Sequence, residues 1–194
     1  MQKIKEYLTL AIMMCIPYLI VMIDNYILKN GVNKHSLTAI SHSLFLIINI
    51  ILLYKIKQNN KDLAGGLLLI IGLFAAILIR ENRENIRDVF GGAIHWSWLA
   101  SALSVCYIWQ AGRNGIRKAF VNLQELHRFG DYNYLICGVI LLLVWSRLWG
   151  NRYVWKGIEH IHYSEALKNT AEEPTQSLAY LIVMYGLIGM LRRQ

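Results

Sequence analysis

The chain has 194 residues, of which 56% are hydrophobic and 16% are charged, and its mean hydropathy is +0.37. This composition excludes a disordered chain and disfavours a soluble globular domain. The formal net charge is +8, but the Lys and Arg residues lie mostly in short connections between apolar runs, which indicates membrane topology and no nucleic-acid partner. We therefore predict an all-α polytopic membrane protein, a bundle of about six transmembrane helices.

Six apolar runs are long enough to cross a hydrocarbon core of about 30 Å. They occupy residues 7–28, 37–54, 63–79, 89–110, 132–149 and 175–191. The first run continues to about Ile23 without a small-residue cleavage signal, so we interpret it as a retained span. Pro174 is expected in the first turn of the last span, where its missing N–H costs little. Cys15, Cys106 and Cys137 lie inside apolar runs and are predicted to be small buried hydrophobes.

An even number of spans places both termini on one side of the membrane. With the termini inside, the inner segments hold eleven of the 20 Lys and Arg residues, a weak preference for cytoplasmic termini. Residues 112–131 carry apolar side chains at helical spacing beside Arg113, Arg117 and Lys118, which predicts a cytoplasmic interfacial helix held by anionic lipid, with a simple anchor as the alternative. Residues 150–173 are predicted to form an outer-side loop with helical pieces, and residues 1–194 a single transmembrane domain.

The unusual polar residues gather at the span ends on the predicted outer side. Charged groups at the membrane surface are tolerated when they pair or line a wet cavity, so we expect a shared polar pocket that binds an anionic or polar ligand. Arg147 is the most informative member, because it follows a long apolar run and its planar fork can clamp Glu81, Glu173 or a phosphate. The predicted ligand-binding set is Arg80, Glu81, His95, Arg147, Lys168, Asn169, Glu172 and Glu173.

Each of these residues also has a purely structural interpretation. For Arg147 it is a long side chain that only snorkels to the interface. Arg80 and Glu81 belong to a stretch whose charges recur at three and four residues, which is typical of a solvated ladder of ion pairs. Glu172 and Glu173 precede the last span, where acids stabilise a helix N-terminus.

No cofactor is predicted, and zinc is the alternative. His42, His95, His160 and His162 are the right ligand types for zinc, but no HExxH or HxxxH spacing occurs. A hydrogen-bonded core histidine is the simpler interpretation of His42 or His95. The Gly65-Gly66 pair is explained better by close helix packing than by phosphate binding.

Several short strings resemble a family. They are Arg80-Glu81, His95-Trp96, Ser146-Arg147-Leu148-Trp149-Gly150 with Trp155, and Lys168-Asn169 with Glu172-Glu173. These residues resemble the Arg-Glu, His-Trp, S-R-L-x-G and K-N-x-x-E-E motifs of an uncharacterised family of bacterial multi-span inner-membrane proteins. The resemblance covers residues 79–187 and departs at Gln176, where another acid is expected. It implies a bacterial inner membrane and a shared outer pocket, and it implies no reaction.

The favoured hypothesis is an inner-membrane protein of unassigned activity whose outer-side pocket binds a membrane lipid head group. The alternative is a membrane-embedded, metal-dependent hydrolase or transferase acting on a lipid, with Glu81 or Glu173 as general base and His95 as a further catalytic candidate. A small transporter and an interaction or immunity protein are further alternatives. The sequence identifies no protein partner.

Overall fold

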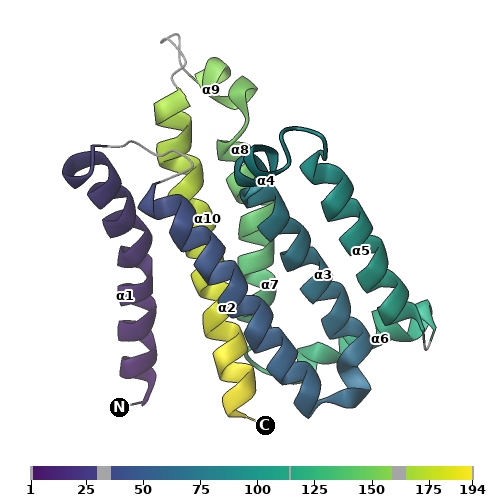
Figure 1. The fold of residues 1–194 in the computed structure, drawn as a ribbon. Coiled ribbons are helices and arrows are strands. Elements are labelled where there is room, and N and C mark those ends of the chain that lie inside the picture. Colours follow the sequence, from purple (N-terminus) through teal and green to yellow (C-terminus); the bar gives the residue numbers. More distant parts are fainter. Residues whose placement is uncertain (1, 30–35, 114, 159–164, 194) are drawn as a thin grey trace. The chain divides into compact units, whose positions relative to one another are not determined.

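The computed structural model describes residues 2–29, 36–113, 115–158 and 165–193. Within these ranges the chain forms helices joined by short connections, and no strand occurs. A helix satisfies its own backbone hydrogen bonds, which is what apolar segments of this length need in lipid. The predicted all-α polytopic fold is confirmed (Figure 1).

Five helices in the described part of the chain are long and apolar enough to cross a membrane, which makes this a multi-pass membrane protein. They are Glu6–Ile27, Leu37–Asn59, Lys61–Glu81, Tyr132–Trp149 and Lys168–Arg192. Large apolar side chains of the first, such as Tyr7, Leu8 and Tyr18, are exposed. A lipid environment accommodates such side chains, whereas water would not.

The chain divides into two compact units. Unit 1 comprises residues Met1–His42 and Ile136–Val183. Its elements are α1 (Gln2–Met22), the π-helical turn η1 (Ile23–Ile27), the start of α2 (Leu37–Asn59), most of α7 (Tyr132–Ile140), the π-helical turn η4 (Leu141–Trp145), α8 (Ser146–Trp149), α9 (Arg152–Ile158) and most of α10 (Glu165–Arg192).

Unit 2 comprises residues Ser43–Leu135 and Met184–Gln194. Besides the remaining parts of α2, α7 and α10, its elements are η2 (Lys61–Leu63), α3 (Ala64–Glu81), α4 (Arg83–Val89), α5 (Trp96–Gly112), α6 (Ile116–Glu125) and η3 (Leu126–Arg128). The apolar side chains of α3, including Leu67, Ile71 and Phe74, are fully buried. Helices α5 and α6 pack against α3, as Figure 1 shows, so α3 forms the centre of this unit.

Two predicted boundaries are wrong. The fourth predicted span begins at Trp96 rather than at residue 89, because Gly91 and Gly92 adopt positive φ values and end the preceding helix; at 17 residues, α5 is shorter than the five spans above. The last helix begins at Glu165, so Pro174 lies inside it rather than in its first turn. Ion pairing between Lys168 and Glu172, four residues apart, supports the extra turns.

The predicted burial of the cysteines is also wrong. Cys15, Cys106 and Cys137 are free thiols on exposed faces of their helices. A small apolar side chain is compatible with lipid as well as with a core, and the apolar runs that contain these residues do not distinguish the two environments.

Candidate functional site

Two of the motif segments named above, residues 146–150 and residues 168–173, meet at the carboxylate of Glu172, within unit 1. Arg147 Nη1 on α8 lies 3.7 Å from Glu172 Oε1, and Lys168 Nζ on α10 lies 3.6 Å from Glu172 Oε2. The side chain of Glu172 is only 10% exposed, whereas those of Arg147 and Lys168 are 42% and 27% exposed. Two partly open cations therefore converge on one covered carboxylate. We call these three residues the Glu172 cluster.

Gly150 makes room for this carboxylate. A Cβ atom added at Gly150 would lie 2.6 Å from Glu172 Oε2 and 2.7 Å from Cδ, too close for any other residue without a shift. The glycine of the S-R-L-x-G string thus provides the backbone approach, and its arginine provides the charge. Trp155 holds the turn after it, because its Nε1 donates a hydrogen bond of 2.5 Å to the carbonyl of Trp149.

Gln176 completes the surroundings of Glu172. Its Nε2 donates a hydrogen bond of 2.9 Å to Glu172 Oε1, while its Oε1 is buried without a hydrogen-bond partner among the residues that the structure describes. An ionised acid at this position would place a second negative charge beside Glu172 and supply no donor. Gln176 therefore gives Glu172 a neutral hydrogen-bond donor as its neighbour.

A second polar group in unit 1 is centred on His42, which is 1% exposed. Its Nε2 lies 2.6 Å from Ser177 Oγ and 3.2 Å from the carbonyl oxygen of Glu173. Its Nδ1 lies 3.3 Å from Glu173 Oε2, which is within ion-pair distance. The ring also meets Tyr180 edge to face, with centroids 5.4 Å apart. His42 is a hydrogen-bonded core histidine, as its simpler interpretation predicts.

The two π-helical turns lie next to polar residues of unit 1. Asp24 lies in η1, is fully buried, and accepts hydrogen bonds from the backbone N–H groups of Leu37 and Thr38, each at 2.8 Å. Directly after η4, buried Ser146 donates a 2.6 Å hydrogen bond to the carbonyl of Leu142. Short π-helical segments often occur at functional sites, and here η4 ends two residues before Arg147.

Arg80, Glu81 and His95 belong to unit 2. Arg80 Nη2 pairs with Glu81 Oε1 of the adjacent residue, and both side chains are partly exposed. His95 is exposed and caps α5, since its Nδ1 accepts a hydrogen bond from the N–H of Ser97 at 3.3 Å. These contacts, each with a residue one or two positions away in the sequence, account for the placement of the three side chains. That they share one pocket with the Glu172 cluster stays a prediction.

The remaining candidates are less defined. Asn169 is half-buried beside Lys168, and His160 and His162 lie outside the described residues. In the portion of the chain that the structure describes, no group of three His, Cys, Asp or Glu side chains is arranged to hold a metal ion. Zinc binding therefore stays an untested alternative.

Sequence reasoning missed Ser177 and chose other partners for Arg147. The predicted partners were Glu81 and Glu173, whereas the structure pairs Arg147 with Glu172. A sequence pattern could have predicted the His42 group. Glu173, Ser177 and Tyr180 lie four and three residues apart and so share one face of an apolar helix. The side chains on that face contact His42. Glu172, one residue before Glu173, lies on a neighbouring face of the same helix and contacts Arg147.

Comparison with protein-family models, with curated proteins and with solved structures finds no match for this chain. The resemblance drawn from the motifs therefore stays a prediction. Its S-R-L-x-G and K-N-x-x-E-E strings nevertheless lie together in the structure, at Arg147, Gly150, Lys168 and Glu172.

Proposed function

We propose that this integral membrane protein binds a polar or anionic ligand, such as a lipid head group, at the Glu172 cluster. The observation that carries the proposal is the convergence of two motif segments on one covered carboxylate. Ion pairs of 3.6 and 3.7 Å are longer than the optimal distance of about 2.8 Å. Arg147 and Lys168 are also partly exposed, so both retain donors for a second anion.

Gln176 extends the same proposal to a ligand with a donor group. Its buried Oε1 accepts no hydrogen bond from the described residues, and an unsatisfied buried acceptor costs about 1–3 kcal/mol. A hydroxyl or ammonium group beside the bound anion would satisfy it. Head groups such as phosphatidylglycerol and phosphatidylethanolamine combine a phosphate with a donor of this kind.

The proposed location is the bacterial inner membrane, with both termini cytoplasmic and the Glu172 cluster outside. This topology needs α5 to be a sixth crossing. Within unit 2, α5 runs alongside the spanning helix α3 in the opposite direction (Figure 1), and Ala111 near its end packs against Leu68 near the start of α3. A helix of 17 residues extends about 26 Å, close to the thickness of a thin bilayer core.

Native mass spectrometry of the detergent-solubilised protein with added phosphatidylglycerol tests ligand binding. The double variant Arg147→Ala/Lys168→Ala should lose at least about tenfold in affinity, since hydrogen bonds from charged donors contribute about 1.5–3 kcal/mol. The control Lys55→Ala/Arg83→Ala removes two exposed cations elsewhere and should retain the lipid. Equal losses in the two double variants would show non-specific charge attraction and contradict the proposal.

A membrane-embedded hydrolase or transferase is a second candidate, favoured by the His42 group. Ser177 Oγ contacts Nε2 of His42, and Glu173 lies at Nδ1 on the opposite side of the ring. A nucleophile, a base and a carboxylate that orients the base occur in this order in serine hydrolases. With Glu173 beside Nδ1, Nε2 would take the Ser177 proton as Oγ attacks a carbonyl carbon. It would then give that proton to the leaving group as the bond from the carbon to the leaving group breaks. Ser177 is fully buried, so a substrate would need α2 and α10 to separate locally.

A fluorophosphonate probe distinguishes this candidate. An activated Ser177 should be labelled covalently, and Ser177→Ala should abolish the labelling. Ser104→Ala is the control, because Ser104 only donates a hydrogen bond to the carbonyl of Ala100 within its own helix. Absence of labelling in native membranes, or labelling that persists in Ser177→Ala, would remove the candidate.

A further inference from the structure

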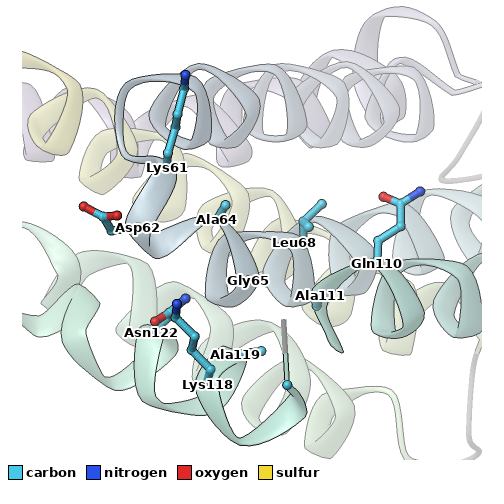
Figure 2. A pocket seen from close by; sticks show the side chains of 11 residues that line it. Lys61, Asp62, Ala64, Gly65, Leu68, Gln110, Ala111, Lys118, Ala119 and Asn122 are labelled. Atoms are coloured by element: carbon cyan, nitrogen blue, oxygen red, sulfur yellow. The ribbon is translucent and has the colours of Figure 1, made fainter. Parts of the chain in front are cut away.

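We infer that a second site, a cavity between η2, α3, α5 and α6 in unit 2, binds the phosphate group of an anionic phospholipid. The cavity encloses about 260 Å³, several times the volume of about 30 Å³ that a water molecule occupies in the liquid. Figure 2 shows it between Lys61 and Asp62 at one side and Lys118 and Asn122 at the other. This site is independent of the Glu172 cluster, and we call it the α6 cavity.

Close packing of two helices builds the cavity wall. A Cβ atom at Gly66 would lie 2.5 Å from the backbone nitrogen of Leu123, so α3 and α6 are in backbone contact there. Gly65, one residue earlier, faces Ala119 and the amide of Asn122. The packing interpretation of the glycine pair is therefore confirmed. Because the nearby side chains are this small, the polar ends of longer residues surround an open space.

The polar lining favours one negative charge. Lys61 and Lys118 contribute two positive charges and Asp62 one negative charge, so the lining carries a net charge of +1. A phosphodiester carries one negative charge and balances this net charge of +1, whereas a phosphate monoester carries about −1.5 to −2 at neutral pH. Gln110 adds a carboxamide to the lining, which donates hydrogen bonds to phosphate oxygens.

Asn122 is the observation that points to a ligand. It is 7% exposed, it lines the cavity, and none of the hydrogen bonds among the described residues involves its side chain. Its carboxamide therefore has two unused N–H donors and one unused acceptor available to a ligand in the cavity. A phosphate oxygen in the cavity would accept a hydrogen bond from Asn122 Nδ2, and a lipid glycerol hydroxyl would donate to Oδ1.

The apolar face of α6 is the reason to expect the cavity at the membrane surface. Ile116 and Phe120 are 47% and 57% exposed on α6, next to Arg117 and Lys118. An amphipathic helix with this pattern lies in the head-group region with its apolar side chains toward the acyl chains. Lys61 also directly precedes the apolar part of a spanning helix. The phosphate of a lipid at this depth is level with the cavity, and its acyl chains are next to Phe120.

Binding of dioleoylphosphatidylglycerol to the full-length protein, measured by native mass spectrometry, tests the inference. Lys61→Ala/Lys118→Ala should weaken lipid binding at this site at least about tenfold. The control Lys55→Ala/Arg83→Ala removes two exposed cations outside the lining and away from α6, and should leave binding unchanged. Asn122→Asp keeps the side-chain shape and adds a negative charge, so it should weaken binding in the same direction. The Arg147→Ala/Lys168→Ala protein should still bind here, which separates this site from the Glu172 cluster.

Competition with inorganic phosphate identifies the source of the phosphate group. If millimolar inorganic phosphate fails to displace the lipid, a phospholipid is the ligand. If it displaces the lipid and itself protects the protein from unfolding, and Asn122→Asp abolishes that protection, the cavity binds free phosphate. The folding of Lys61→Ala/Lys118→Ala and of Asn122→Asp is checked by a melting temperature within about 3 °C of that of the unaltered chain. If both folded variants bind lipid and phosphate as tightly as the unaltered chain does, the inference is wrong.

Discussion

Asp24 shows how one buried charge is stabilised in this chain. Its carboxylate lies at the N-terminus of α2 and accepts hydrogen bonds from two backbone N–H groups and from the hydroxyl of Thr38. A helix N-terminus leaves such donors unsatisfied and carries a partial positive charge. A carboxylate 13 residues away in sequence therefore acts as the cap of α2, and it links α1 to α2 within unit 1.

Replacing Asp24 should destabilise the protein clearly. Asp24→Ala removes three hydrogen bonds to a charged acceptor and leaves buried donors unpaired, so we expect a loss of about 2–4 kcal/mol in unfolding free energy. Thermal unfolding in detergent measures this effect. Asp62→Ala, which removes an exposed carboxylate, is the matched control, and an equal decrease in both variants would contradict the capping role.

At the residue scale the sequence predicts which residues are unusual but not which of them touch. Glu172 and Glu173 both precede the last apolar run, and neighbouring residues on a helix point about 100° apart. Only the rotation of α10 decides that Glu172 meets Arg147 while Glu173 meets His42. That rotation is fixed by side-chain packing along the whole helix, which a local pattern of residues does not contain.

A substitution at Gly66 tests the contact between α3 and α6 on which the α6 cavity depends. A methyl group there would overlap the backbone of α6 at Leu123, so Gly66→Ala should push the two helices apart. We expect a loss of about 1–3 kcal/mol, observed as a lower melting temperature. In Gly112→Ala the added atom would meet only the Ile116 side chain, with Cδ1 at 3.7 Å and Cβ at 3.9 Å. These are ordinary contacts, so this control should be neutral or slightly stabilising.

Element boundaries were predicted well where apolar runs end at charges and poorly where backbone geometry ends a helix. The run 132–149 matches its helix, because Asp131 and Gly150 delimit it in the sequence. The start of α5 was missed because two glycines with positive φ, rather than a change of polarity, separate it from α4. The spacing predicted a helix within residues 112–131, and α6 occupies 116–125 of that range. Its place at the membrane surface stays a prediction.

For the whole molecule, membrane residence follows from composition and from five long apolar helices, whereas orientation does not. If α5 is a sixth crossing, both termini are cytoplasmic. In a background without the three native cysteines, Lys57→Cys and Arg117→Cys should resist a membrane-impermeant maleimide in intact cells. Asp88→Cys and Asn151→Cys should react with it. Labelling of Arg117→Cys together with Asp88→Cys would mean that α5 does not cross.

The most direct test of ligand binding at the Glu172 cluster is an experimental structure of the protein in a phospholipid mesophase. We expect a head-group phosphate within about 3 Å of the Arg147 guanidinium and the Lys168 ammonium, with a donor group at Gln176 Oε1. Arg147 and Lys168 closed directly onto Glu172 at about 2.8 Å, with only water around them, would contradict the proposal.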